Sequence, residues 1–97
     1  MDHYRLLFTQ RALDDLAKIV GYIAEDDEEA AYRFGTSLVD HVELLEHFPR
    51  MGTVIRNRSS VRRLVHAPIL VYYKIHEATG LLEILHFRHG SRKPMKF

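Results

Sequence analysis

The sequence predicts an α+β fold with two layers: an N-terminal strand, then an antiparallel helical hairpin packed on a mainly antiparallel sheet, in the order β-α-α-β-β-β. Apolar residues recur at three- and four-residue steps along two stretches of the first half, which is the period of a helix. The second half holds short β-like runs separated by Gly and Pro. Two apolar helix stripes need a sheet face to bury against, so the opposite face or its rim is left for function.

The first elements are expected to be a strand over residues 4–8 and a helix from residue 10 to about residue 24. Thr9 lies between them, and threonine caps helices by accepting a backbone N–H bond. The apolar stripe of this helix is predicted to contain Leu13, Leu16, Ile19 or Val20, and Ile23.

The second helix follows an acidic run at residues 25–29, whose carboxylates are favoured at the positive end of the helix dipole. A helix start therefore explains this run better than a metal site does. The helix should end at Pro49, because proline has no N–H and disfavours helix in the residue before it. Its predicted apolar stripe is Ala31, Phe34, Leu38, Val42, Leu45 and Phe48.

A basic loop over residues 50–60 comes next, with a short strand at residues 53–56. Three further strands are expected at residues 61–66, 69–76 and 81–89. Pro68 separates the first two of these, and Gly80 supplies a tight hairpin between the last two. In the middle strand, Ile69, Val71, Tyr73 and Ile75 fall on one face, which is predicted to be the dry one.

The composition is that of a small globular chain. Its 97 residues suffice for one domain, expected to span residues 1–97, with 46% hydrophobic and 28% charged residues. No run approaches the roughly 18 apolar residues of a membrane span, and the N-terminus lacks the apolar core of a signal peptide. Cysteine is absent, which excludes disulfides and thiolate sites. We expect a cytoplasmic protein without membrane contact or cofactor.

Charge is distributed unevenly along the chain. Residues 1–48 hold 4 Lys and Arg against 11 Asp and Glu, a balance of −7, whereas residues 49–97 hold 10 against 2, a balance of +8. This polarity suggests that the C-terminal half meets an anionic partner, either nucleic acid or an acidic protein segment. The alternative is that two solvated faces simply differ in charge.

The seven histidines do not predict a metal site. His86 and His89 are three residues apart on an expected strand, which places them on opposite faces. Arginine is more informative, because guanidinium groups suit phosphate or carboxylate partners. Neighbouring Arg62 and Arg63 must point to opposite faces, and the one towards the helices needs a rim position or an acidic neighbour such as Glu83. The candidate partner-binding residues are Arg56, Arg58, Arg62, Arg63, Arg88, His89 and Arg92.

A trail of motifs runs through nearly the whole chain: Ala12-Leu13-Asp14-Asp15-Leu16, Ile19-x-x-Tyr22-Ile23, Ala31-x-x-Phe34, Leu45-x-x-Phe48-Pro49-x-x-Gly52, Arg63-x-x-x-x-Pro68 to Tyr72-Tyr73, and Ile84-x-x-x-x-His89-Gly90-x-Arg92. In this order and spacing the sequence resembles the ParE/RelE superfamily of toxins from bacterial type II toxin–antitoxin systems. The resemblance implies a RelE/ParE-like fold and one of two activities.

The RelE branch implies a ribosome-dependent endonuclease that cuts messenger RNA. Arg63 and Arg92 match two of its basic positions, and His86 or His89 can act as acid or base, as in histidine-using relatives. However, Leu70 stands where an arginine is expected, and no tyrosine follows Arg92. The nuclease set is therefore incomplete.

The ParE branch implies a poison that inhibits DNA gyrase without chemistry of its own, causing growth arrest and plasmid stabilisation, and this branch is favoured. It also implies a hetero-oligomer with a cognate ParD-like antitoxin, whose acidic C-terminal segment suits a basic partner and whose extended part suits exposed strand edges. Operator DNA would be contacted only through the antitoxin. A third possibility is a degenerate toxin that only binds its antitoxin.

Overall fold

A computed structural model describes residues 3–56 and 58–90, without the side chains at positions 58 and 59. The order of its elements confirms the predicted fold class. The elements are β1 (Arg5–Phe8), α1 (Gln10–Ala24), α2 (Glu28–Glu43), a 3₁₀ turn η1 (Leu44–Glu46), β2 (Thr53–Ile55), β3 (Arg58–His66), β4 (Ile69–His76) and β5 (Leu81–His89).

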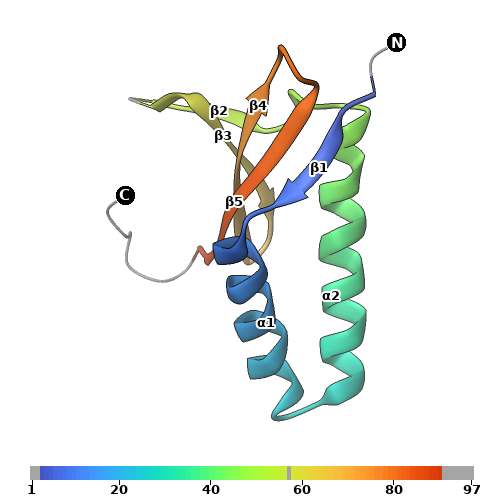
Figure 1. Ribbon diagram of the computed structural model, residues 1–97. Coiled ribbons are helices and arrows are strands. Elements are labelled where there is room, and N and C mark those ends of the chain that lie inside the picture. The colour runs from blue at the N-terminus through green and yellow to red at the C-terminus, as the bar shows by residue number, and fades with distance from the viewer. Residues whose placement is uncertain (1–2, 57, 91–97) are drawn as a thin grey trace.

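The five strands form one sheet in the order β1-β5-β4-β3-β2 (Figure 1). Neighbouring strands from β2 to β5 are antiparallel, and Gly80 turns the β4–β5 hairpin with a φ of 66°, which suits glycine. β1 is the exception, because it pairs in parallel with β5, from Arg5 opposite Leu81 to Phe8 opposite Ile84. The first and last strands of the chain therefore lie side by side.

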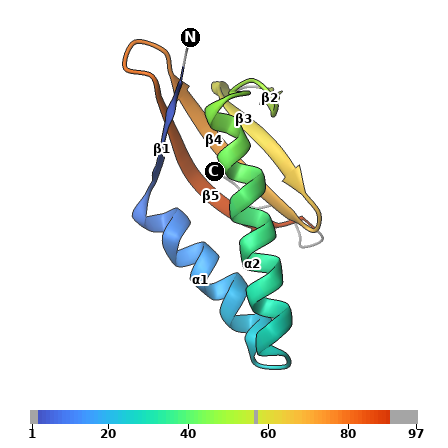
Figure 2. The same cartoon turned by 90° about the vertical axis from the view of Figure 1, so that its right-hand side faces the viewer.

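The helices form an antiparallel hairpin that extends beyond the sheet (Figure 1). Figure 2 shows α2 crossing one face of the sheet, while α1 starts beside the end of β1. Both helices begin with a side-chain cap: Thr9 accepts from the N–H of Ala12 at 3.1 Å, as expected, and Asp27 of the acidic run accepts from the N–H of Ala30 at 3.0 Å. No helix in the described part of the chain is long and apolar enough to cross a membrane.

Two residues of the predicted helix stripes point outwards. In α1 the fully buried residue is Ala12, and Leu13 is 46% exposed. In the second stripe Phe48 is 60% exposed. The reason is that α2 does not continue to Pro49: its α-helical part ends at Glu43, and the tighter 3₁₀ turn that follows changes the direction of later side chains.

The core lies between α2 and the inner sheet face, which is the face towards the helices. The middle strand confirms the predicted dry face, since Ile69, Val71 and Tyr73 are at most 1% exposed and Ile75 packs against them. The buried core cluster is Ala12, Leu38, Val42, Leu45, Leu64, Ile69, Val71, Tyr73, Leu82, Ile84 and Phe87.

The loop after η1 is attached to this core through the hydroxyl of Tyr73. That hydroxyl donates to the carbonyl of Pro49 at 2.7 Å and accepts from the N–H of Gly52 at 2.9 Å. Burial raises the pKa of Tyr73, which keeps its hydrogen available for donation. A side chain at Gly52 would place its Cβ 2.7 Å from the Tyr73 ring, so only glycine fits without displacing the ring.

Tyr73→Phe should destabilise the protein by about 1–3 kcal/mol, because it removes one hydrogen-bond partner each from a buried N–H and a carbonyl. Urea unfolding curves provide the measurement. Tyr32→Phe is the matched control, because Tyr32 is 74% exposed and should change stability little. Equal midpoints for the two variants would show that the loop does not depend on the Tyr73 hydroxyl.

Candidate functional site

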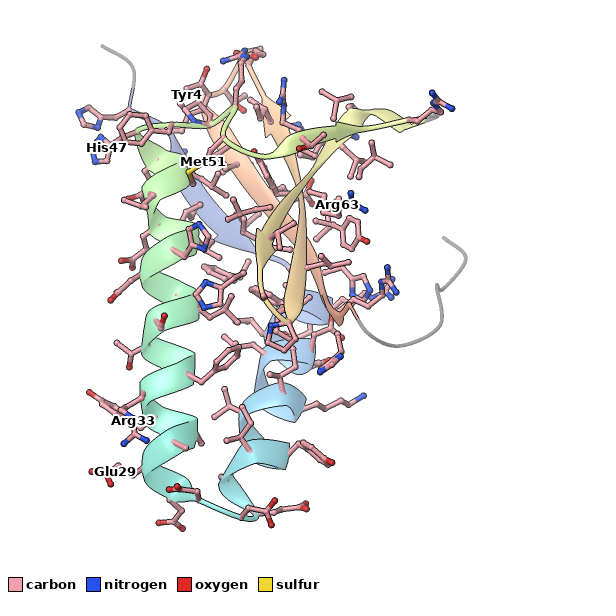
Figure 3. All side chains as sticks on the ribbon, turned by 180° about the vertical axis from the view of Figure 1, so that it is seen from behind. Tyr4, Glu29, Arg33, His47, Met51 and Arg63 are labelled. Atoms are coloured by element: carbon pink, nitrogen blue, oxygen red, sulfur yellow. The ribbon has the colours of Figure 1, made fainter. Side chains whose placement is uncertain are left out.

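The candidate site lies on the outer face of the sheet, away from α2. Arg63 of β3, Tyr72 of β4 and His86 of β5 are neighbours in register across three strands. A β-bulge sets this alignment, because Tyr73 pairs with Ile84 while Tyr72 pairs with His86, which leaves Leu85 unpaired. Figure 3 shows Arg63 projecting from the sheet on the side away from α2.

Two side chains of α1 complete the arrangement around His86. Asp15 Oδ2 lies 2.6 Å from His86 Nδ1 and also accepts from the N–H of Phe87 at 3.1 Å. Arg11 Nη2 lies 3.4 Å from His86 Nε2. Although it faces away from α2, the His86 side chain is buried, with 5% of its surface exposed. We call the group Arg11, Asp15, Arg63, Tyr72, His86 and Arg88 the outer-face cluster.

Tyr72 joins the imidazole to the arginine. Its ring stacks on His86 at 5.8 Å between centroids and 18° between planes, and its hydroxyl accepts from Arg88 Nη2 at 3.2 Å. Three guanidinium nitrogens in this cluster, Arg63 Nε, Arg88 Nε and Arg88 Nη1, are buried and have no hydrogen-bond partner in the described part of the chain. Arg63 and Arg88 are half-buried as residues, and guanidinium groups suit anionic groups, so the cluster is suited to an anionic group of a partner.

The predicted partner-binding residues do not all come together. Arg63 and Arg88 both lie beside Tyr72, whereas Arg56 is exposed in the turn after β2 and His89 pairs with Ile69 at the far end of β5. The side chain of Arg58 and the whole of Arg92 lie outside the described residues.

Arg62 has the rim position that was expected for an arginine facing the helices. It donates to the carbonyl of Gly52 at 2.8 Å and to that of Arg50 at 3.4 Å, and so helps to hold the loop that Tyr73 binds. Glu83 instead contacts His76 at 2.9 Å.

Arg11, Asp15 and Tyr72 belong to the cluster but were not among the predicted site residues. Asp14 and Asp15 are adjacent and identical in type, and Asp14 accepts a hydrogen bond from Gln10 at the surface. The one local signal is that Arg11 and Asp15 are four residues apart, which puts them on one side of the helix. Their contact with β5 depends on the fold.

A second feature is an apolar groove between α1 and α2, with a volume of about 390 Å³. It is open to solvent, and Tyr32 at its edge is 74% exposed. The residues that line it are Leu16, Val20, Ala31, Tyr32, Gly35, Thr36, Val39 and Asp40. An exposed apolar groove between two helices is suited to an apolar segment of another protein.

A pair of imidazoles joins α2 to the end of β3. His41 Nδ1 and His66 Nδ1 are 2.8 Å apart, Ser37 Oγ lies 3.4 Å from His66 Nε2, and the Phe34 ring packs edge-on against His66. Burial lowers the pKa of His66, and the neighbouring His41 lowers it further. The hydrogen bond between the rings needs one nitrogen to accept, so two protonated imidazoles cannot keep it.

The sequence of this chain is similar to those of known toxins. Residues 6–94 match the family described as the ParE toxin of the type II toxin–antitoxin system parDE. The Y4kP protein of Sinorhizobium fredii is 34% identical over 88 residues, which cover 89% of this chain and 91% of that protein. The toxin RelE2 of Caulobacter vibrioides is 32% identical over 90 residues, with 91% and 97% covered.

Solved structures share the fold. A chain of the chromosomal ParDE system of P. aeruginosa superposes with a TM-score of 0.75 at 21% identity, covering 90% of this chain and 96% of that one. A chain of the RelBE2 toxin–antitoxin complex of Mycobacterium tuberculosis gives 0.63 at 22% identity, with 90% and 98% covered. At these identities the likeness shows the architecture.

Stability should fall on acidification because of the His41–His66 pair. The folded pKa of His66 lies below its ordinary value of 6.5, so the unfolded chain binds this proton more readily. The contribution is fully present above pH 6.5 and is lost as pH falls from there through the folded pKa.

His66→Asn should reduce this pH dependence, because an amide can hydrogen-bond to His41 but does not titrate. Urea unfolding at pH 7.5 and pH 5.5 measures the effect, and His47→Asn, at an exposed histidine outside the pair, is the control. If wild type and His66→Asn lose the same stability between the two pH values, the pair is not responsible.

Proposed function

The chain belongs to the ParE toxin family of type II toxin–antitoxin systems, and we propose that it acts by inhibiting DNA gyrase. In this proposal it binds gyrase and stabilises the enzyme on cleaved DNA without a chemical step of its own. The observation that carries the proposal is the match to the ParE family, which extends from residue 6 to residue 94.

The outer-face cluster supports a binding role. Arg63 and Arg88 both lie beside Tyr72 and are half-buried, and guanidinium groups suit an anionic group of a partner. His86 is less suited to proton transfer in this conformation, because it is 5% exposed and both of its ring nitrogens contact α1.

A ribosome-dependent endonuclease is the second candidate. The observation in its favour is the carboxylate–imidazole pair of Asp15 and His86 near two arginines, a combination that general acid–base catalysis uses. Codon-specific cleavage of a messenger in a translating extract, lost in His86→Gln, would establish it over gyrase inhibition. A chain that arrests no growth when expressed alone would instead fit a degenerate toxin.

We also propose that a cognate antitoxin neutralises the protein by binding the groove between α1 and α2. Two structural neighbours come from toxin–antitoxin systems, one of them solved as the complex. The groove offers an apolar surface of a size that an amphipathic helix can fill. Such an antitoxin would form a hetero-oligomer with this chain, and its acidic segment would suit the basic C-terminal half.

In a supercoiling assay with purified gyrase, the wild-type protein should block supercoiling and cause cleaved plasmid to accumulate. Arg63→Ala and Arg88→Ala should each weaken inhibition by about tenfold or more, as expected for the loss of a charge-assisted hydrogen bond.

Arg33→Ala is the matched control, because it removes the same charge from the exposed surface of α2, where Arg33 contacts Glu29 at 3.6 Å (Figure 3). Unchanged supercoiling at saturating wild-type protein would contradict the gyrase proposal.

For the antitoxin, Tyr32→Ala should weaken binding of the protein encoded beside this toxin by about tenfold, because an aromatic side chain at a groove is a typical binding hot spot. Calorimetric titration measures the affinity. Tyr22→Ala is the control, since Tyr22 is also a helix-surface tyrosine, 70% exposed, but does not line the groove. Equal losses in the two variants would place the antitoxin elsewhere.

A further inference from the structure

We infer that Asp15 is a positioning residue that sets Arg88 in place through His86 and Tyr72. It touches no target itself in this scheme. The inference uses the contacts of the outer-face cluster, and it depends on the proposed function only where it concerns gyrase.

The first step is the way in which α1 reaches the edge of β5. β1 ends at Phe8, opposite Ile84, and no strand among the described residues pairs with the rest of β5 on that side. The N-cap and the first turns of α1 instead bind the backbone of β5 at this edge. Thr9 Oγ1 donates to the carbonyl of Ile84 at 3.0 Å, and Asp15 accepts from the N–H of Phe87 at 3.1 Å. The backbone of β5 therefore holds the Asp15 carboxylate independently of the contact with the imidazole.

The second step is the choice of tautomer at His86. A carboxylate accepts hydrogen bonds, so the nitrogen 2.6 Å from Asp15, Nδ1, carries the hydrogen. A guanidinium only donates, so Nε2, which lies 3.4 Å from Arg11 Nη2, is the acceptor. Two residues one helical turn apart thus hold the neutral ring as the Nδ1–H tautomer and fix its orientation.

The third step carries that orientation to Arg88. The fixed imidazole stacks on the Tyr72 ring, with 5.8 Å between the ring centroids. The Tyr72 hydroxyl accepts a hydrogen bond from Arg88 Nη2 at 3.2 Å. The guanidinium carbon of Arg88 lies 6.0 Å from the centroid of the same ring. If the Asp15 carboxylate is removed, the imidazole can rotate. The Tyr72 ring then loses the ring that it stacks on, and Arg88 loses a fixed hydrogen-bond partner.

The test combines nitrogen NMR of the His86 ring and of Arg88 Nε with the supercoiling assay. Wild type should show the Nδ1–H tautomer. Asp15→Ala should move His86 towards the Nε2–H tautomer, shift the Arg88 Nε signal and weaken gyrase inhibition by about tenfold. Asp15→Asn, whose amide oxygen can accept both hydrogen bonds, should restore the tautomer and the Arg88 signal.

Asp14→Ala is the matched control, since it removes the same charge one residue away and should change none of these signals. A wild-type ring that carries its hydrogen on Nε2 would overturn the inference, and this result does not depend on any variant folding. An Arg88 signal that is the same in wild type and folded Asp15→Ala would also overturn it. If both NMR results are as expected but wild type does not inhibit gyrase, the positioning role is supported and the proposed target is wrong.

Discussion

The two hydrogen bonds of the Tyr73 hydroxyl hold the helices and the sheet together at the loop that connects them. Tyr73 is fully buried in the central strand, and its hydroxyl binds the loop that leads from the helices into the sheet at Pro49 and Gly52. Arg62 closes the same loop from the neighbouring strand. The Phe48-Pro49-x-x-Gly52 motif that supports the family assignment is therefore explained largely by folding, because Gly52 lies where a side chain would strike the Tyr73 ring.

Side chains on the two faces of the sheet make different kinds of contact. Tyr72 and Tyr73 are adjacent, yet one stacks on His86 at the outer face and the other holds a loop at the inner face, as the alternation of a strand requires. The bulge at Leu85 is what brings His86 opposite Tyr72. A flat, regular ladder would not align the imidazole with both α1 and the arginines.

Local pattern was sufficient to predict the order of elements, the Thr9 cap and the dry face of β4, because these depend on neighbours in sequence. It was wrong for Leu13 and Phe48, whose directions depend on packing and on the 3₁₀ turn. The parallel pairing of β1 with β5 and the role of Asp15 involve residues more than 70 positions apart. The spacing of Arg11 and Asp15 is a weak signal, because Gln10 and Asp14 have the same spacing, so that part of the site required the fold.

The pairing of β1 with residues 81–84 of β5 has a consequence for synthesis of the chain on the ribosome. The helical hairpin is complete by residue 43, and its contacts are local, so it can form early. β1 has to wait, because its partner, residues 81–84, is synthesised more than 70 residues after it. A nascent chain that stalls before residue 81 can therefore form the helical hairpin but cannot pair β1 with β5. It also lacks the outer-face cluster, because His86 and Arg88 have not yet been added.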